Sequence, residues 1–157
     1  MKNQSSRPVT LLLAEDDPDD CLLARQAMEK SRLVSDLRCV EDGEELLDYL
    51  RRRGKFADPK QSPRPVLILL DLNLPRKDGR EALREIKNDP KLRAIPIIVL
   101  TTSKSEEDVT RAYNLGVNSY ITKPVRFSAL VEVMQAIGKY WFEIVELPGR
   151  PRTNRHG

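Results

Sequence analysis

The sequence has a single histidine, His156, and only two cysteines, Cys21 and Cys39. One histidine gives no histidine-rich metal site, and it counts against a serine or cysteine nucleophile that uses histidine as its base. Two cysteines make neither the disulfide framework of a small secreted domain nor a cysteine metal cluster, and they fit a reducing compartment. These shortages remove several common kinds of enzyme and metalloprotein from consideration.

Long hydrophobic runs are also missing. The longest, such as VLILL at 66–70, are far shorter than the roughly 20 residues needed to cross a bilayer. The opening residues, MKNQSSRP, contain no apolar stretch typical of an export signal. We therefore expect a cytoplasmic protein that does not associate with membranes.

Charge of one sign does not dominate the chain. In 157 residues, 27 basic and 24 acidic side chains give a net charge of +3, and 39% of residues are hydrophobic. This composition predicts one water-soluble globular domain. Short basic clusters occur at 51–55, 76–77 and 150–155, without the interleaved aromatic residues that stack on bases, so we expect no nucleic-acid partner.

Apolar runs of strand length alternate with segments of helical period. The expected strands cover residues 9–14, 36–40, 66–70, 96–100 and 118–122. The expected helices cover residues 18–30, 44–53, 80–88, 105–116 and 127–145, and the proline-rich stretch 54–65 reads as a loop. Five strands alternating with five helices predict an α/β fold with a parallel sheet and right-handed crossovers.

Charged and hydroxyl side chains follow the ends of these strands, where ligands bind in such sheets. Glu15 and Asp16 follow the first strand, Asp71 the third, Thr101 the fourth and Lys123 the fifth. If the first and third strands are neighbours, three carboxylates converge and need a cation between them. Mg²⁺, a hard ion that takes oxygen ligands, is the expected cofactor.

This set of groups suits an aspartate that accepts a phosphoryl group, with metal, lysine and hydroxyl neutralising the transferred oxygens. Two other chemistries fit less well. A phosphatase using an aspartyl phosphate needs a second aspartate two residues after the nucleophile, where this chain has Asn73. A flavin-binding module needs a loop rich in glycine and hydroxyls where this chain has EDDPDD. A third alternative, a scaffold that makes no use of phosphorylation, would not need these carboxylates, the hydroxyl and the lysine together at the strand ends.

The chain resembles the receiver domains of two-component response regulators over residues 8 to about 145. Four motifs in the family's order and spacing support the resemblance: LLLAEDD, LLDLNLPRKDG, IIVLTTS and YITKP. The resemblance implies a flavodoxin-like, doubly wound (βα)5 fold with strand order 2-1-3-4-5. It also implies a signalling switch that catalyses its own Mg²⁺-dependent phosphorylation and dephosphorylation, and not an enzyme acting on other substrates.

The resemblance further implies a role for each site residue. Asp71 would be the phosphoacceptor, Asp16 a direct metal ligand, Glu15 an indirect one, and the backbone carbonyl of Asn73 a further ligand. Another set would bind the phosphoryl group or respond to it: Thr101 as the switch hydroxyl, Lys123 as the phosphate partner and Tyr120 as the switch aromatic. The Lys123–Pro124 peptide bond would be cis.

Two positions depart from the family's commonest pattern. Glu15 stands where aspartate is more frequent, which is a tolerated exchange. Thr102 follows the switch threonine where many receivers have alanine, serine or glycine. We hypothesise that the Thr102 methyl group narrows access to Asp71 and slows loss of the phosphoryl group.

The expected division of the chain is an N-terminal extension over 1–7, the receiver domain over 8–145 and a flexible basic tail over 146–157. The tail is too short for a DNA-binding output domain, so we expect the signal to leave through the receiver's own surface. On the last helix, one stripe should face the sheet: Leu130, Met134, Ile137, Trp141 and Ile144. Tyr140, Phe142 and Val145 should remain uncovered, either as a homodimer interface or under a folded-back tail.

A narrower resemblance concerns the stretch YWFEIVELP, the loop GKFADPKQSPRP, and LTTS with YITKP. These are similar to the stand-alone response regulators that pair with bacterial phytochromes, which are light-regulated histidine kinases. The partner implied is therefore a sensor histidine kinase of the phytochrome class. The alternative is a stand-alone regulator, or a phosphorelay intermediate, of a histidine kinase that is not a phytochrome.

Overall fold

The computed structural model describes residues 9–31 and 36–141. Five parallel strands form one sheet in the order β2-β1-β3-β4-β5. Their bounds are Thr10–Ala14 for β1, Asp36–Val40 for β2, Leu67–Leu70 for β3, Ile97–Thr101 for β4 and Ser119–Thr122 for β5. The fold class and strand order predicted from the sequence are confirmed.

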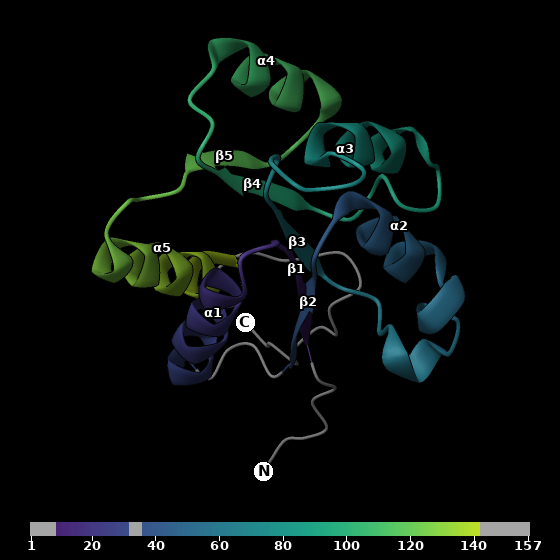
Figure 1. Cartoon of the computed structure of the whole chain (residues 1–157), viewed down its shortest axis with the longest axis horizontal. Helices are drawn as coiled ribbons and strands as arrows, with labels where there is room; N and C mark the ends of the chain where they lie inside the picture. The colour runs from purple at the N-terminus through teal and green to yellow at the C-terminus, as the bar shows by residue number, and fades with distance from the viewer. Residues whose placement is uncertain (1–8, 32–35, 142–157) are drawn as a thin grey trace, which may run out of the picture.

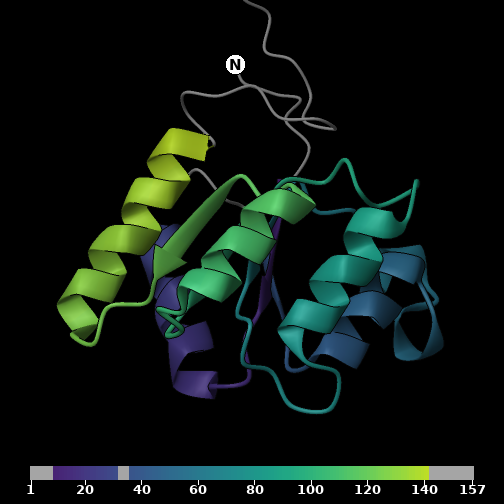
Figure 2. The same cartoon turned by 90° about the horizontal axis from the view of Figure 1, so that it is seen from above.

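Helices cover both faces of this sheet (Figures 1 and 2). Their bounds are Pro18–Ser31 for α1, Gly43–Arg51 for α2, Gly79–Asn88 for α3, Glu106–Leu115 for α4 and Phe127–Lys139 for α5. Helices α1 and α5 pack on one face against Leu11, Leu13 and other alternate strand residues. Helices α2, α3 and α4 pack on the other face against Leu12 and Ala14. The three central strands are therefore covered on both sides, which explains their continuous apolar runs.

Polar caps fix where several helices begin, and these starts lie at the edge of the sheet that carries the candidate site. Asp42, Asp78 and Ser105 accept hydrogen bonds from backbone N–H groups in the first turns of α2, α3 and α4. The predicted loop over 54–65 contains two single turns of 3₁₀ helix, η1 (Gly54–Phe56) and η2 (Pro59–Gln61).

The apolar stripe predicted on the last helix faces the sheet, as far as the structure describes this helix. Leu130, Met134 and Ile137 are buried against the sheet, and the half-buried Trp141 packs on the same cluster. Ile144 lies outside the described residues. No helix within residues 9–31 and 36–141 has both the length and the hydropathy to cross a bilayer.

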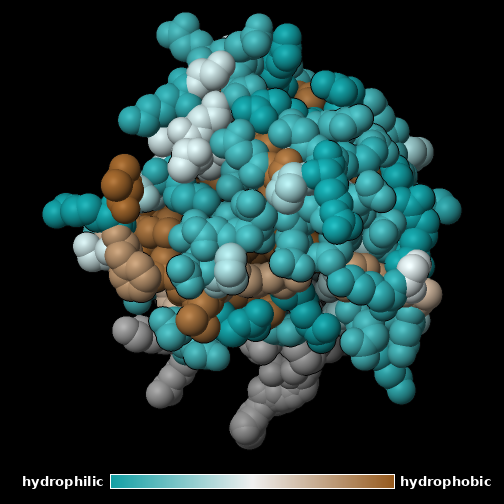
Figure 3. Space-filling view, in the orientation of Figure 1, coloured by the Kyte–Doolittle hydropathy of each residue, from teal (hydrophilic) through white to brown (hydrophobic). Residues whose placement is uncertain are grey.

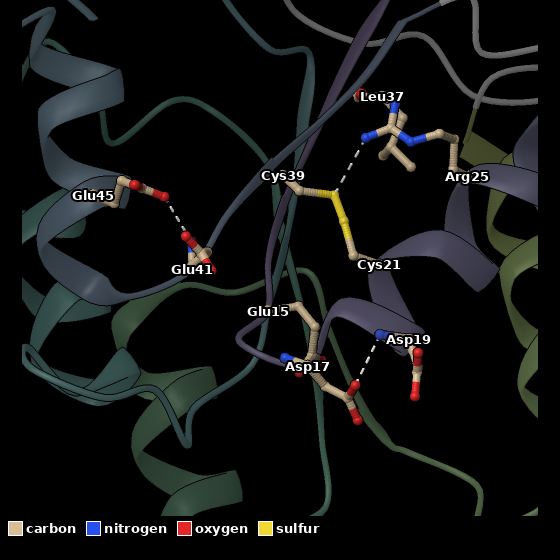
Figure 4. Close-up of a disulfide and its surroundings, with 9 residues drawn as sticks. All are labelled: Glu15, Asp17, Asp19, Cys21, Arg25, Leu37, Cys39, Glu41 and Glu45. Atoms are coloured by element: carbon tan, nitrogen blue, oxygen red, sulfur yellow. Dashed lines mark hydrogen bonds between the residues drawn. A yellow bond between two sulfur atoms is a disulfide. The ribbon is translucent and has the colours of Figure 1, made fainter. Parts of the chain in front are cut away.

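One bond in the structure was not predicted from the sequence, and one prediction is wrong. The structure joins Cys21 and Cys39 in a disulfide (Figure 4). The crossover from α1 back to β2 brings their Cα atoms to 6.7 Å although 18 positions separate them, a proximity that cysteine counting does not reveal. The Lys123–Pro124 peptide bond, predicted to be cis, is trans, like every other peptide bond in the described residues. Trans is the lower-energy isomer of an Xaa–Pro bond by about 0.5–1 kcal/mol.

Candidate functional site

The register of the sheet brings the acidic residues together. Ala14 of β1 pairs with Leu70 of β3, so Glu15 and Asp71 follow side by side. The backbone N–H of Asp71 donates to the Ala14 carbonyl at 3.1 Å. Carboxylate oxygens of Glu15, Asp16 and Asp71 all lie within 4.8 Å of one another. Glu15 and Asp71 are buried while Asp16 is exposed, so the cluster opens to solvent on one side.

Lys123 supplies the positive charge in this cluster. Thr101 and Thr122 pair across β4 and β5, and the next residue, Lys123, donates its backbone N–H to the Thr101 carbonyl at 2.6 Å. The Lys123 ammonium lies 2.5 Å from a carboxylate oxygen of Glu15 and 3.3 Å from one of Asp71. One lysine therefore partly compensates two buried carboxylates.

Burial and ion pairing shift the pKa values of Glu15 and Lys123. Desolvation raises the pKa of Glu15 to about 7, although the hydrogen bond from Lys123 opposes the rise. For Lys123, burial would lower the pKa, but the hydrogen bond and negative charge of Glu15 outweigh it, and its pKa lies above the usual range. Lys123 thus stays charged at neutral pH, whereas Glu15 lies close to its titration point when no cation is bound.

Asp71 is held from two sides. The buried Thr101 hydroxyl donates to one of its carboxylate oxygens at 2.8 Å, and the backbone N–H of Asn73 donates to the same oxygen at 3.0 Å. The Asn73 side-chain amide donates to the hydroxyl oxygens of Thr102 at 3.2 Å and of Thr101 at 3.4 Å. The Asp71 carboxylate is therefore fixed in direction, with its second oxygen toward Lys123.

Tyr120 and the loop after β4 form a second polar group beside the cluster. The Tyr120 hydroxyl donates to the Ser103 carbonyl at 3.0 Å, and the Ser103 hydroxyl donates to Asp108 at 2.6 Å. Arg80 of α3 donates two guanidinium hydrogen bonds to the same carboxylate, at 2.6 and 2.7 Å. The hydrogen bonds from Arg80 hold the pKa of Asp108 at about 2, against the opposing effect of burial. Asp108 thus links α3, α4 and the β4–α4 loop at neutral pH.

Two glycines let the chain after Asp71 turn tightly. A Cβ atom at Gly79 would collide with the backbone carbonyl of Asp71, and one at Gly43 would collide with the carbonyl of Lys77. The N–H groups of these glycines donate to the Leu72 and Lys77 carbonyls, each at 3.0 Å. The loop after β3 is therefore packed directly against the first residues of α2 and α3.

Sequence reasoning missed several polar partners. Asp20 lies 3.0 Å from the Lys123 ammonium, and its place at the end of EDDPDD, in the first turn of α1, was the available signal. Ser103, Arg80 and Asp108 come from three separate segments, so no local pattern points to their contact.

The residue set proposed as a dimer interface is only partly described. Tyr140 is 52% exposed, while Phe142 and Val145 lie outside the described residues. Val125 and Phe127, at the start of the same helix, are also exposed. Hydrophobic side chains gather on the left of Figure 3, where Figure 1 places α5 beside α1.

The donor set fits a divalent cation. Three carboxylates supply oxygen ligands, which hard ions such as Mg²⁺ and Mn²⁺ accept. Two of these carboxylates are buried with one lysine between them, so an added cation would relieve the remaining repulsion.

Comparison with known proteins identifies the family. Residues 11–135 match the model of the response regulator receiver domain. The chain belongs to this family. The receiver is 43% identical over 148 residues to the response regulator Rcp1 of a Synechocystis strain, covering 94% of this chain and 99% of Rcp1.

Two solved structures are similar to this receiver along nearly its whole length. The phosphorylated cyanobacterial phytochrome response regulator RcpA is 43% identical, with a TM-score of 0.85, covering 91% of this chain and all of that one. The Mn²⁺-bound form of Rcp1 is 44% identical, with a TM-score of 0.84, covering 90% of this chain and all of that one. The predicted likeness to stand-alone regulators of phytochromes is therefore confirmed.

Proposed function

We propose that this receiver is a stand-alone signalling switch in which Asp71 accepts a phosphoryl group from a sensor histidine kinase in a Mg²⁺-dependent reaction. The observation that carries the proposal is the position of Asp71 between a lysine, a buried hydroxyl and two further carboxylates. A carboxylate is a competent nucleophile for phosphorus, so no histidine or other base is needed.

In the proposed transfer, a carboxylate oxygen of Asp71 forms a bond to phosphorus while the bond from phosphorus to the kinase histidine breaks. Lys123 and the Thr101 hydroxyl lie where they can stabilise the charge on the transferred oxygens. Asp16 would hold Mg²⁺ directly, Glu15 indirectly, and Asp71 and the Asn73 carbonyl would complete the protein ligands. The ion supplies positive charge that neutralises the phosphoryl oxygens.

The response to phosphorylation would begin at Thr101. Its hydroxyl donates to Asp71 in this structure and would turn to the phosphoryl group once that group is present. Ser103, two residues further, accepts from Tyr120 through its carbonyl, so movement of this loop reaches Tyr120. Two populated states of the loop would then differ in the surface that they present on α4, β5 and α5.

The partner of this surface is proposed to be a second copy of the chain. Tyr140, Val125 and Phe127 are large apolar side chains exposed along α5 and the turn before it. Phe142 and Val145 are proposed to extend the same interface. Residues 8–145 would form the switch unit, which signals through its own surface.

The upstream partner is proposed to be a phytochrome histidine kinase. The support is the full-length similarity to RcpA, which is described as a phytochrome response regulator. The alternative is a histidine kinase of another sensor class, since the residues around Asp71 would serve either. Phosphotransfer from purified kinases of both classes separates these possibilities, because only the cognate kinase transfers its phosphoryl group rapidly.

The central proposal is tested with a small phosphoryl donor, acetyl phosphate, which removes the need for a kinase. Wild-type protein with Mg²⁺ should gain one phosphoryl group, measured by the mass of the intact chain, and Asp71→Asn should gain none. Asp78→Asn is the matched control, since Asp78 also follows β3 but caps α3 and is not one of the three grouped carboxylates. Persistent labelling of Asp71→Asn would refute the assignment.

Self-association is tested separately by sedimentation velocity before and after phosphorylation. Tyr140→Glu places a charge in the proposed interface and should shift the protein toward monomer. Asn88→Glu, at an exposed position on α3, adds the same charge outside this surface and should leave the association unchanged. Equal sedimentation of both variants and the wild type would remove Tyr140 from the interface.

A further inference from the structure

The disulfide is not used by the phosphoryl chemistry, yet it lies next to the acidic cluster. Cys21 is in the first turn of α1, and Cys39 is in the edge strand β2 (Figure 4). The segment from Glu15 to Cys21 connects β1 to the disulfide, and it contains two of the proposed metal ligands, Glu15 and Asp16. The disulfide and the proposed metal ligands thus share one short stretch of chain.

Both ends of this acidic segment are attached to consecutive residues of β2. At one end, the backbone N–H of Glu15 donates to the carbonyl of Val40 at 2.9 Å. At the other end, Cys21 is bonded to Cys39, the residue before Val40. Glu15 to Cys21 therefore close a small ring with β2, of which the sulfur–sulfur bond is one link.

Hydrogen bonds inside the ring pass this restraint on to the carboxylates. The backbone N–H of Asp17 donates to the Glu15 carboxylate at 3.0 Å, and the N–H of Cys21 donates to the Asp17 carbonyl at 3.1 Å. Opening the sulfur–sulfur bond would leave the Cys21 end of the segment held by hydrogen bonds and packing alone. The position of Glu15 and Asp16 would then be less restricted.

The two cysteines are partly exposed to solvent. Cys21 and Cys39 are half-buried and line a cleft of about 660 Å³ that also contains Arg25, Lys55 and Asp16. A guanidinium nitrogen of Arg25 lies 3.8 Å from the Cys39 sulfur. A positive charge at that distance stabilises the thiolate that attacks an external disulfide.

We propose that Cys21 and Cys39 are a redox-active dithiol site whose oxidation state sets the affinity of the neighbouring carboxylates for a divalent cation. The proposal rests on the metal site assigned under the proposed function.

The oxidant is a low-molecular-weight disulfide. The Cys39 thiolate attacks one of its sulfurs, forming a mixed disulfide and releasing one thiol after protonation. Cys21 then loses its proton, attacks the Cys39 sulfur and releases the second thiol. Two protein thiols are oxidised and one external disulfide is reduced to two thiols.

The direction of the effect follows from the ring. Oxidised protein holds Glu15 and Asp16 in place before the cation arrives, so less conformational freedom is lost on binding. Reduced protein must order the same segment when the cation binds. We expect reduction to weaken cation binding by about tenfold, the lower end of what is lost when the groups supporting metal ligands are removed.

The test uses the full chain equilibrated with oxidised glutathione or with dithiothreitol, with free thiols counted by titration. Binding of Mn²⁺ is then measured by electron paramagnetic resonance and binding of Mg²⁺ by calorimetry. Oxidised wild type should lose both thiols and bind the cation more tightly than reduced wild type. The variant with Cys21→Ser and Cys39→Ser should bind like reduced protein under both conditions.

Three outcomes would overturn the proposal, and they are distinct. Equal, measurable cation affinity in the oxidised and reduced wild type would refute the coupling while leaving the proposed function intact. No cation binding in either state would refute the metal site and with it the coupling. Failure of glutathione to remove the two thiols would refute the redox site itself.

Discussion

The two halves of the sheet edge are built differently. At the ends of β1 and β3, the acidic half (Glu15, Asp16 and Asp71) is fixed by adjacent backbone hydrogen bonds and by a covalent link to β2. At the ends of β4 and β5, the hydroxyl half (Thr101 to Ser105 with Tyr120) is held by side-chain hydrogen bonds, among them those to Asp108. The half proposed to bind a cation is preorganised, whereas the half proposed to rearrange is held by side-chain hydrogen bonds, which exchange easily.

Lys123 joins the two halves, so its removal should have the largest effect. Lys123→Ala leaves Glu15 and Asp71 without the ammonium group that contacts both of them. It also removes a proposed donor to the phosphoryl oxygens. We expect the initial rate of labelling by acetyl phosphate to fall by about 10²–10³-fold. Lys104→Ala, at an exposed lysine of the β4–α4 loop, should keep the wild-type rate. An unchanged rate for Lys123→Ala would mean that the halves work independently.

The covalent link should have the next largest effect, on stability. The disulfide closes a loop across 18 positions, and a loop near this size contributes about 3 kcal/mol to the free energy of unfolding. Urea unfolding of oxidised wild type should therefore show a higher midpoint than that of the variant with Cys21→Ser and Cys39→Ser. With dithiothreitol present the two midpoints should coincide. A difference that survives reduction would come from packing of the side chains and not from the bond.

The acidic half should also make the stability of the fold depend on pH, through Glu15. The pKa of Glu15 in the fold is about 7, above its ordinary value of 4.5. The folded state therefore binds the proton more tightly than the unfolded state, and stability is lost as pH rises from about 4.5 to 7. The loss attributable to Glu15 is roughly 2–3 kcal/mol.

Glu15→Gln should remove this loss, because an amide does not ionise. The measurement is the melting temperature of both proteins with a chelator present, at intervals between pH 4.5 and 7.5. The curves should differ in slope over this window and run parallel above it. Parallel curves throughout would mean that Glu15 in the folded protein does not titrate in this pH range.

The smallest effect is expected in the hydroxyl half, at Thr102. Its side chain is exposed beside Asp71 and its hydroxyl accepts from Asn73. If its methyl group screens the phosphoryl group from water, Thr102→Ala should speed dephosphorylation several-fold, a barrier change of about 1 kcal/mol. Thr102→Val keeps the branched shape and should retain the slow rate. Equal rates in all three proteins would reject the screening hypothesis.

The sequence predicted the sheet because buried parallel strands are continuous apolar runs, as at Leu67–Leu70. It also predicted the meeting of Glu15, Asp16 and Asp71, since parallel strands present their ends at one edge. It could not predict the Cys21–Cys39 bond, which depends on how α1 lies over β2. Nor could it predict the polar group around Asp108, where three segments meet at angles that no periodicity encodes.

The glycine contacts beside Asp71 set a practical boundary for redesign of this receiver. Enlarging Gly79 would press on the peptide unit of Asp71, and enlarging Gly43 would press on the same loop from α2. Libraries meant to tune signal duration should therefore keep both positions and vary the solvent-facing rim around Thr102. The absence of a side chain at two places thus limits which mutations can change the lifetime of the proposed aspartyl phosphate without disrupting the fold.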